Sequence, residues 1–484
     1  MNLSGAGLFI DGKSVQGKGE AYDVICPATG KVYFSTRGAD AAQTEEALQS
    51  SQKAFKTWSK TTLNERAAWI TKLCTAMDAH RADFVEAVTH EMGKAYGEAN
   101  NDLDICINSM KFFMEQGKRV YETGVTDWNK PLGKSYNVMI RRPVGVVAAH
   151  LAWNWPIQNM GIKLGPALIS GCTILLKPSQ KSPVTALLLA EILKEIDFPA
   201  GVVNVVTGPS SVVGTAINES KIPRLISLIG SSETGRLVMK QGATSVKHYS
   251  MELGGNAPAI VMPDADLKLA AKLIAGRKIR GCGQSCSSMN RIYVHKDVHD
   301  EFIGYLKKEV ESFESGWGPE KPAAIGPMID IPTRDEKLAM IQEAVDGGAK
   351  VLVGGCIPAG LPEEFADGAF LAPTLIDDAT EEMRLCKEEA FCPVLPVMTF
   401  EDFGDVIARA NNTEHGLSSY VFTYDTRIIA RALEELEFGE VCINETTRGP
   451  WLPHIGIKES GIGCDQSKWA LDEYYVTRRF TVTV

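Results

Sequence analysis

The chain of 484 residues contains no run of about 18 apolar residues, the length at which a segment becomes a candidate for crossing a membrane as a helix. Residues 1–5 lack the basic start and apolar stretch of a secretory signal peptide. A net charge of −10 at pH 7, without any strongly basic stretch, argues against a nucleic-acid partner. These absences predict a cytoplasmic protein that binds neither membranes nor nucleic acids.

The sequence also lacks the repeated cysteine and histidine spacing of a metal site. Its 11 cysteines are an odd number and are scattered from Cys26 to Cys464. Cys282 and Cys286 stand four residues apart, but no second pair and no histidine lies close to them in the sequence, so no metal is expected there. In a chain of this size, scattered cysteines indicate reduced thiols in a reducing compartment.

What the sequence does contain is an alternation of helical and strand-like segments. After a short β start, residues 41–60 and 64–80 keep apolar side chains at helical spacing. From residue 141 the pattern changes to short apolar runs separated by helical stretches. Strands are predicted at residues 144–149, 173–178, 202–207 and 225–229. Because apolar strands alternating with helices are typical of a parallel sheet covered on both faces, this region is predicted to bind a dinucleotide.

A second α/β pattern begins after residue 253. Residues 257–261 and 291–294 are predicted to be strands, and residues 298–313 a helix. Loops rich in glycine and proline follow, without an internal repeat or a low-complexity linker, so the α/β units are expected to interlock. Residues 476–484 are rich in β-forming side chains, and an exposed strand of this kind invites pairing with another protomer.

Three short segments carry side chains suited to catalysis. Cys286 lies in the segment GQSC and Glu252 in the segment MELGGN. A thiol can form a covalent intermediate, and a carboxylate can activate the water that hydrolyses it. Asn154, in the segment WNWP, offers an amide donor to a developing oxyanion.

Each of these residues has an ordinary alternative, because most cysteines are inert packing groups and an asparagine near a proline is commonly a turn residue. Taken together, however, the three segments resemble those of the aldehyde dehydrogenase superfamily. The resemblance covers nearly the whole chain, from FIDGK at residues 9–13 to the strand-like tail.

The resemblance implies oxidation of an aldehyde to a carboxylic acid by an NAD(P)-dependent enzyme. Cys286 matches the nucleophile, Glu252 the general base and Asn154 the oxyanion donor, which acts together with the backbone N–H of Cys286. Lys163 matches a lysine near the glutamate, and Asp465 is expected to extend a proton path. Because relatives that pass the acyl group to coenzyme A commonly lack the glutamate, Glu252 favours hydrolysis to a free acid.

A cofactor site is predicted around the segment GSSETG at residues 230–235. It follows a predicted strand and opens a helix at about Gly235, so that a helix N-terminus can approach a pyrophosphate, although the glycine spacing differs from the common Rossmann fingerprint. By resemblance, Lys177 reaches the adenosine ribose. Gln180 stands where a glutamate often repels a 2′-phosphate, and Lys181 adds a positive charge, so both NAD and NADP are expected to bind.

Glu389 and Phe391 match the family segment that holds the nicotinamide ribose, and a carboxylate is a suitable acceptor for ribose hydroxyls. Cys392 stands where the family usually has glycine, so the backbone angles there are expected to differ. The complete set of predicted cofactor-binding residues is Trp153, Lys177, Ser179, Gln180, Gly214, Gly230, Ser231, Gly235, Leu253, Glu389 and Phe391.

Three residues are candidates for the substrate pocket. His454, in the segment HIGIKESGIG, resembles a histidine that faces the substrate hydroxyl in lactaldehyde and glycolaldehyde dehydrogenases. Arg448 could meet an anionic end of the substrate, or it could be a solvated loop residue. Trp155 would belong to an aromatic entrance. Ile162 stands where some relatives carry an arginine that clamps a carboxylate, which weakens the case for a semialdehyde.

The predicted substrate is therefore a small 2-hydroxyaldehyde such as lactaldehyde or glycolaldehyde. Succinic semialdehyde or another acidic semialdehyde is the alternative, followed by simple aliphatic or aromatic aldehydes. A catalytically silent relative that keeps only the fold is a further alternative, which the intact set Cys286, Glu252, Asn154 and Lys177 disfavours.

The resemblance also implies a division of the chain into three parts, all within an α/β fold. Residues 1–120 and 141–252 form a Rossmann-like, parallel-sheet NAD(P)-binding domain, and residues 253–444 form a second, catalytic α/β domain. Residues 121–140 and 465–484 form a small β element through which family members oligomerise. The predicted partners are thus a small-molecule aldehyde and further copies of the chain, as a homodimer or a homotetramer.

Overall fold

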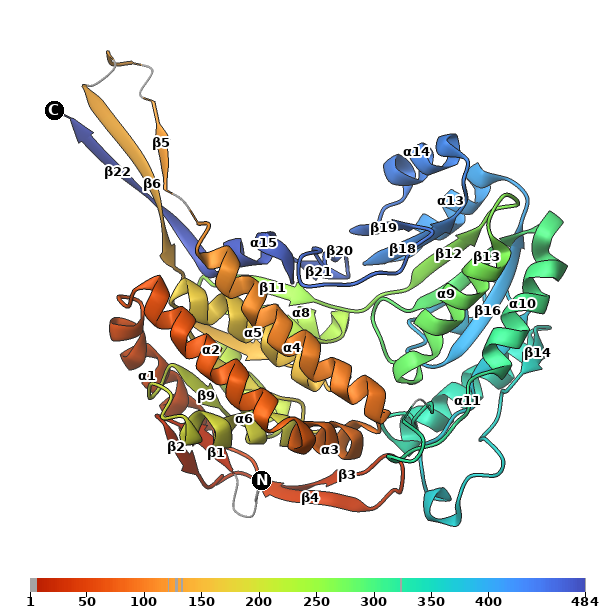
Figure 1. The fold of residues 1–484 in the computed structure, drawn as a ribbon, viewed down its shortest axis with the longest axis horizontal. Helices are drawn as coiled ribbons and strands as arrows, with labels where there is room; N and C mark the ends of the chain where they lie inside the picture. Colours follow the sequence, from red (N-terminus) through yellow and green to blue (C-terminus); the bar gives the residue numbers. More distant parts are fainter. Residues whose placement is uncertain (1–6, 121, 127–128, 132–133, 323, 484) are drawn as a thin grey trace.

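The computed structural model describes residues 7–120, 122–126, 129–131, 134–322 and 324–483. Two large sheets, each covered by helices, lie next to each other, and a narrow three-stranded sheet projects from the first of them (Figure 1). This arrangement confirms the predicted α/β fold class, with two sheets of mainly parallel strands and a small β element. Among the described helices, none combines the length and the apolar composition needed to cross a membrane.

The first sheet has eight strands in the order β2-β1-β9-β8-β7-β10-β11-β21. The parallel strands are β7 (Val146–His150), β8 (Thr173–Lys177), β9 (Val203–Val205), β10 (Pro223–Ile229) and β11 (His248–Glu252). The antiparallel strands are β1 (Leu8–Ile10), β2 (Lys13–Val15) and β21 (Gly461–Ile462). The four strands predicted between residues 144 and 229 are confirmed.

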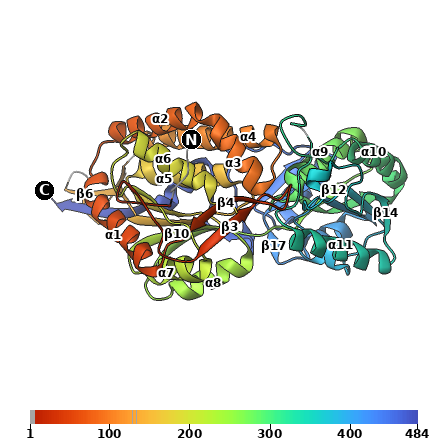
Figure 2. The ribbon, with the colours of Figure 1, turned by 90° about the horizontal axis from the view of Figure 1, so that it is seen from below.

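Helices cover both faces of this sheet, which explains why its strands are apolar on both sides (Figure 2). One face carries α2 (Leu63–Ala79), α3 (Arg81–Met92), α4 (Tyr96–Gly117), α5 (Pro156–Ser170) and α6 (Val184–Glu195). The other carries α1 (Ala41–Trp58), α7 (Thr215–Glu219) and α8 (Ser232–Gly242). Helix α2 begins with a reciprocal capping box between Thr62 and Glu65, which satisfies backbone N–H groups of the first turn.

The second sheet has seven strands in the order β14-β15-β16-β13-β12-β18-β19. They are β12 (Ala257–Val261), β13 (Met289–His295), β14 (Lys350–Val353), β15 (Thr374–Asp377), β16 (Val394–Phe400), β18 (Ser418–Phe422) and β19 (Glu440–Ile443). Its main helices are α9 (Leu267–Ile279), α10 (His299–Glu311), α11 (Ile331–Asp346), α13 (Phe403–Asn411) and α14 (Thr426–Glu435). The strands and the helix predicted in this region are confirmed.

The projecting sheet consists of β22 (Tyr475–Thr483), β6 (Ser135–Pro143) and β5 (Thr123–Val125). Strands β22 and β6 pair in antiparallel register along their whole length (Figure 1). The strand predicted for the tail is confirmed as far as Thr483. Val484 lies outside the described residues, as do residues 121, 127–128 and 132–133 of the predicted hairpin.

The segment that follows β19 connects the two large sheets at the point that matters for function. The chain leaves the second sheet, and β21 then joins the first sheet beside β11, where Gly461 lies opposite Glu252. On the way, His454 forms an isolated antiparallel bridge with Asp465. Side chains from the end of the second sheet are thereby brought next to Glu252.

Candidate active site

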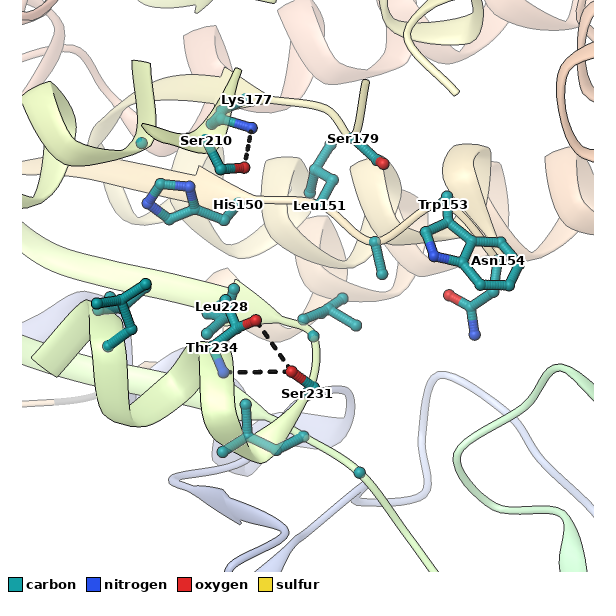
Figure 3. A pocket seen from close by; sticks show the side chains of 18 of the residues that line it. His150, Leu151, Trp153, Asn154, Lys177, Ser179, Ser210, Leu228, Ser231 and Thr234 are labelled. Atoms are coloured by element: carbon teal, nitrogen blue, oxygen red, sulfur yellow. Dashed lines mark hydrogen bonds between the residues drawn. The ribbon is translucent and has the colours of Figure 1, made fainter. Parts of the chain in front are cut away.

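A groove of about 420 Å³ opens at the carboxyl ends of the parallel strands of the first sheet and extends to the cysteine loop of the second (Figure 3). This is the edge at which open parallel sheets bind ligands. Most of the predicted cofactor residues line it, as do two predicted catalytic residues. They are Trp153, Lys177, Ser179, Gly214, Gly230, Ser231, Leu253, Glu389 and Phe391, together with Asn154 and Cys286.

Two of the predicted cofactor residues do not line this groove. Gly235 lies within the first turns of α8, which begins at Ser232 rather than at Gly235 as predicted. A side chain at Gly235 would meet Leu253 Cδ1 at 2.7 Å, so this glycine permits close packing of the helix on Leu253. Gln180 is half-buried beside the groove. The neighbouring Lys181 forms an ion pair with Asp330 at 2.7 Å, so its charge is shared with another partner.

At one end of the groove, Lys177 presents a buried amine. Its Nζ donates to Ser210 Oγ at 3.1 Å, as Figure 3 shows, and burial lowers the pKa of this lysine to about 8. No carboxylate of the described residues lies within ion-pair distance of it. A buried cation without an anionic partner fits a ligand that brings hydroxyls or negative charge.

His150 and Asn218 also line this end, and sequence reasoning missed both of them. His150 Nε2 lies 2.9 Å from Asn218 Oδ1, and burial lowers the pKa of His150 to about 3, so the ring is neutral. His150 ends β7 directly beside Lys177 at the end of β8. The rule that ligands bind at strand carboxyl ends could therefore have identified it from the predicted strands.

The middle of the groove is formed by the N-terminus of α8. The Ser231 hydroxyl caps this helix by accepting from Thr234 N at 3.2 Å (Figure 3). Gly230 N donates to Glu252 O at 3.0 Å. The N-terminus of an eleven-residue helix carries partial positive charge and suits a phosphate. Together with Lys177, these residues fit a dinucleotide.

The other end of the groove is formed by Glu389, Phe391 and Trp153. Glu389 Oε1 accepts from Gly255 N at 2.9 Å, and burial raises the pKa of Glu389 to about 7. Phe391 packs edge-to-face on Trp153 at 5.6 Å between ring centroids. The unusual backbone angle in this segment belongs to Phe391, with φ of 48°, and not to Cys392, which is buried.

Cys286 lies on the loop between α9 and β13. Hydrogen bonds from three other parts of the chain hold this loop in place. Gln284 Oε1 accepts from Ile329 N at 2.9 Å, and Tyr420 OH donates to Ser287 O at 2.9 Å. Asn154 Nδ2 donates to Gln284 O at 3.1 Å, which ties this amide to the loop and places it at the same end of the groove as the thiol. The second N–H of this amide is available to an oxyanion.

Glu252 ends β11 and is buried, and neither of its carboxylate oxygens has a hydrogen-bond partner among the described residues. Burial raises the pKa of Glu252 well above its usual value. Lys163 Nζ lies 2.6 Å from Asp465, and both side chains are buried. Lys163 and Asp465, both predicted to act together with Glu252, thus form an ion pair with each other, and neither donates a hydrogen bond to Glu252.

The structure brings His454 into the centre of the site. His454 Nε2 lies 3.7 Å from Cys286 Sγ and 3.8 Å from Glu252 Oε2, while Nδ1 lies 2.6 Å from Glu440 Oε1. Sequence reasoning missed Glu440. It precedes His454 by 14 residues on a different element, and no sequence pattern links the two.

Arg448 differs from both sequence-based expectations, a substrate clamp or a solvated loop residue. Its guanidinium forms an ion pair with Glu440 and donates to Ser418 Oγ at 3.0 Å and to Tyr420 OH at 2.9 Å. Its charge is therefore neutralised by Glu440 within the protein and is not free to bind an anionic substrate. Trp155 is half-buried, and the amine of Lys94 lies 3.4 Å from the centre of its ring.

The model of the Aldehyde dehydrogenase family matches residues 14–480. This chain belongs to that family. The predicted family and the predicted class of enzyme, an aldehyde dehydrogenase, are thereby confirmed.

Several characterised members of the aldehyde dehydrogenase family are similar over their full length. The NADP⁺ succinate-semialdehyde dehydrogenase GabD of Escherichia coli is 36% identical over 481 residues, which are 98% of each chain. The glutarate-semialdehyde dehydrogenase of Pseudomonas putida is 35% identical over 100% of both chains. The crystal structure of lactaldehyde dehydrogenase from Escherichia coli has a TM-score of 0.94 at 30% identity and covers 99% of each chain.

Proposed function

We propose that this aldehyde dehydrogenase uses NAD or NADP as hydride acceptor and forms a thioester on Cys286, which is then hydrolysed to the free acid. The observation that carries the proposal is that a groove suited to a dinucleotide ends at the thiol. Cys286 and Asn154 line the same groove as Lys177 and Ser231. Glu252 is not among the residues that line the groove, and it is left for the hydrolytic step.

The residues divide the reaction between them. The thiolate of Cys286 attacks the aldehyde carbon, and the oxyanion is stabilised by Asn154 Nδ2 and the backbone N–H of Cys286. The bound cofactor supplies the hydride acceptor, and loss of hydride from the adduct leaves a thioester. Glu252 then takes a proton from water, the water oxygen attacks the acyl carbon, and the thiolate leaves.

Both cofactors are compatible with the residues near the adenosine end. Lys177, Ser179 and Ser210 would hold the ribose, and the α8 N-terminus the pyrophosphate. Gln180 carries no charge that would repel a 2′-phosphate. Lys181 is bound to Asp330, so it adds less attraction for that phosphate than its sequence position suggests.

The substrate that the site supports best is a small 2-hydroxyaldehyde. The Nε2 of His454 lies 3.7 Å from the reacting sulfur, so a hydroxyl on the carbon next to the carbonyl would come within its reach. Ile162 is buried and Arg448 is engaged with Glu440, so neither position offers a free cation for a carboxylate.

An acidic semialdehyde is the second candidate, and a different observation favours it. The relatives that are 35–36% identical over the full chain are named for succinate and glutarate semialdehydes. The imidazole of His454 could also face a carboxylate if the substrate is short enough to bring it there.

The ratio of kcat/KM for glycolaldehyde or lactaldehyde to that for succinic semialdehyde separates these candidates. A ratio above ten, about 1.4 kcal/mol in transition-state binding, is expected for a hydroxyl-reading pocket. A ratio below one would replace the hydroxyaldehyde by the semialdehyde. As a control, Cys286→Ser should form no NAD(P)H with any aldehyde, and activity in this variant would contradict the proposed mechanism itself.

We also propose that the enzyme is a homodimer or homotetramer assembled through the projecting sheet. Strand β22 is an edge strand of that sheet, and Phe480 and Val482 on it are about half exposed. An edge with apolar side chains is a surface that another copy of the chain can extend or cover.

A further inference from the structure

A cysteine that lines the groove, a histidine and a glutamate form a chain of contacts. Cys286 Sγ is 3.7 Å from His454 Nε2, and His454 Nδ1 is 2.6 Å from Glu440 Oε1. The three residues come from three separate parts of the chain: the loop after α9, the segment after β19, and the start of β19. This is the arrangement of nucleophile, base and orienting carboxylate found in thiol-dependent hydrolases.

Glu440 is itself fixed. Arg448 pairs with its second oxygen, and Ser418 Oγ donates to the same oxygen at 2.6 Å. Although burial opposes ionisation, His454 and Arg448 hold the pKa of the Glu440 carboxyl well below its usual range. Glu440 is therefore an anion that keeps the proton on Nδ1 and leaves Nε2 directed at the thiol.

The surroundings of His454 favour its protonated form. Burial opposes its charge, but the carboxylates of Glu440 and Glu252 raise the pKa of His454 well above its usual value. The groups that face the ring are Glu440, Glu252 and Cys286. Behind them lie two ion pairs, Arg448 with Glu440 and Lys163 with Asp465.

We propose that His454 is a further catalytic residue of this enzyme: an imidazolium, oriented by Glu440, that pairs with the Cys286 thiolate before attack and with the Glu252 carboxylate after it. This proposal rests on the proposed role of Cys286 as the nucleophile. It differs from substrate recognition, because the pairing exists before any aldehyde binds.

Each step of the proposed role balances in protons and charge. A proton passes from Cys286 Sγ to His454 Nε2, which gives a thiolate and an imidazolium. When the sulfur bonds to the aldehyde carbon, it becomes neutral and the negative charge passes to the aldehyde oxygen, so the anionic side chain that remains nearest to Nε2 is Glu252, at 3.8 Å. The cation then favours the ionised carboxylate that takes a proton from water. Hydrolysis releases the acid and the thiolate, which pairs with the imidazolium again, and the proton that Glu252 took from water passes to solvent.

Alkylation of the free enzyme by iodoacetamide tests the pairing without a substrate. Cys356 is exposed and serves as the reference thiol within the same molecule. Peptide mass spectrometry gives the ratio of the Cys286 rate to the Cys356 rate. Because only a thiolate reacts, this ratio should rise at least about tenfold between pH 9 and pH 6 in the wild type. A flat ratio in the wild type would overturn the proposal, and this arm depends on no variant.

Two variants identify the source of the effect. In His454→Gln the ratio should stay flat with pH, and in Glu440→Gln, which keeps the imidazole, the rise should be reduced. If one variant fails to fold, the other still tests the proposal, because His454→Gln removes the imidazolium and Glu440→Gln removes the carboxylate that orients it. A wild-type-like rise in a folded His454→Gln variant would assign His454 to substrate contact or packing and overturn the inference.

The proposed function can fail separately from this inference. If Cys286→Ser retained aldehyde oxidation, the assigned nucleophile would be wrong, whatever the alkylation profile. If Cys286→Ser is inactive but the alkylation ratio of the wild type is flat, Cys286 remains the nucleophile and only the role of His454 falls.

Discussion

At the scale of single residues, the buried ionisable groups of this active site differ in whether they have a hydrogen-bonded partner. Glu252 and Lys163 are both buried, but Lys163 has a carboxylate partner in Asp465, whereas Glu252 has no hydrogen bond from any described residue. Burying an ionisable group without a hydrogen-bond partner costs several kcal/mol, so a group kept in that state is a candidate for a functional role. Glu252 is consequently the carboxylate with the strongest case for a role in catalysis.

Replacing Glu252 by glutamine tests that role. Glu252→Gln should still give a burst of NAD(P)H equivalent to the enzyme sites, because attack and hydride loss do not need the base. Steady-state turnover should fall by about 10²–10⁴, the usual contribution of a general base. Stopped-flow absorbance measures both quantities.

The pH dependence provides a second readout of the same substitution. Because burial raises the pKa of Glu252, the base is protonated at low pH, and wild-type turnover should rise as the pH increases through its ionisation. Turnover of Glu252→Gln should lack this limb. An equal loss of burst and turnover would mean that Glu252 acts before the thioester forms.

At the scale of elements, the site depends on how closely the cysteine loop approaches the strand β12. A side chain at Gly255, which precedes β12, would overlap the carbonyl oxygen of Cys286, a backbone atom that cannot move without shifting the loop. A side chain at Gly276, within α9, would meet no heavy atom of the described residues within 4 Å. The two glycines therefore make a matched pair.

Gly255→Ala should lower kcat more than tenfold because Cys286 moves relative to Asn154, and it should also destabilise the fold by about 1–3 kcal/mol. Gly276→Ala should keep full activity. Its free energy of unfolding should increase by about 0.5–1 kcal/mol, because alanine loses less backbone entropy than glycine when a helix forms. Steady-state kinetics and urea unfolding measure the two effects. Unchanged activity in a folded Gly255→Ala variant would show that the loop tolerates displacement.

The elements themselves could be predicted from the sequence, because their signals are local. Apolar runs gave the strands β7 to β10 within two residues of their observed ends. The start of α8 was predicted less well: it was expected at about Gly235, whereas the helix begins at Ser232. The earlier start arises because the Ser231 hydroxyl caps the helix. The ion pairs could not be predicted, since Arg448 and Lys181 find partners that lie far from them in the sequence or on other elements.

At the scale of the whole molecule, the site is assembled by the return of the chain between the two large sheets. His454 meets Cys286 and Glu252 only because β21 joins the first sheet beside β11 after β19 has ended in the second. No local pattern encodes this crossing. The resemblance supplied Cys286, Glu252 and Asn154 as separate matches, whereas the approach of His454 to both Cys286 and Glu252, and its contact with Glu440, required the tertiary structure.

The projecting sheet carries the remaining prediction at this scale, that the protein assembles into dimers or tetramers. Phe480 and Val482 are two residues apart on β22 and therefore point to the same face, and Tyr136, which pairs with Val482, is 54% exposed. A strand that projects from the body and presents apolar side chains gains stability when a second copy covers it. The wild type should accordingly sediment as a dimer or tetramer at micromolar concentration.

The double variant Phe480→Glu and Val482→Glu should sediment as a monomer, because charges on this face would be buried without partners in the assembly. Val246→Glu is the control, since Val246 is an apolar residue that is 86% exposed in the loop after α8, outside the projecting sheet. It should leave the oligomer intact. A monomeric wild type would contradict the predicted assembly, and an oligomer that survives the double substitution would show that assembly uses another surface. Because the groove and the cysteine loop lie within one chain, the monomeric variant should keep its burst of NAD(P)H even if its stability falls.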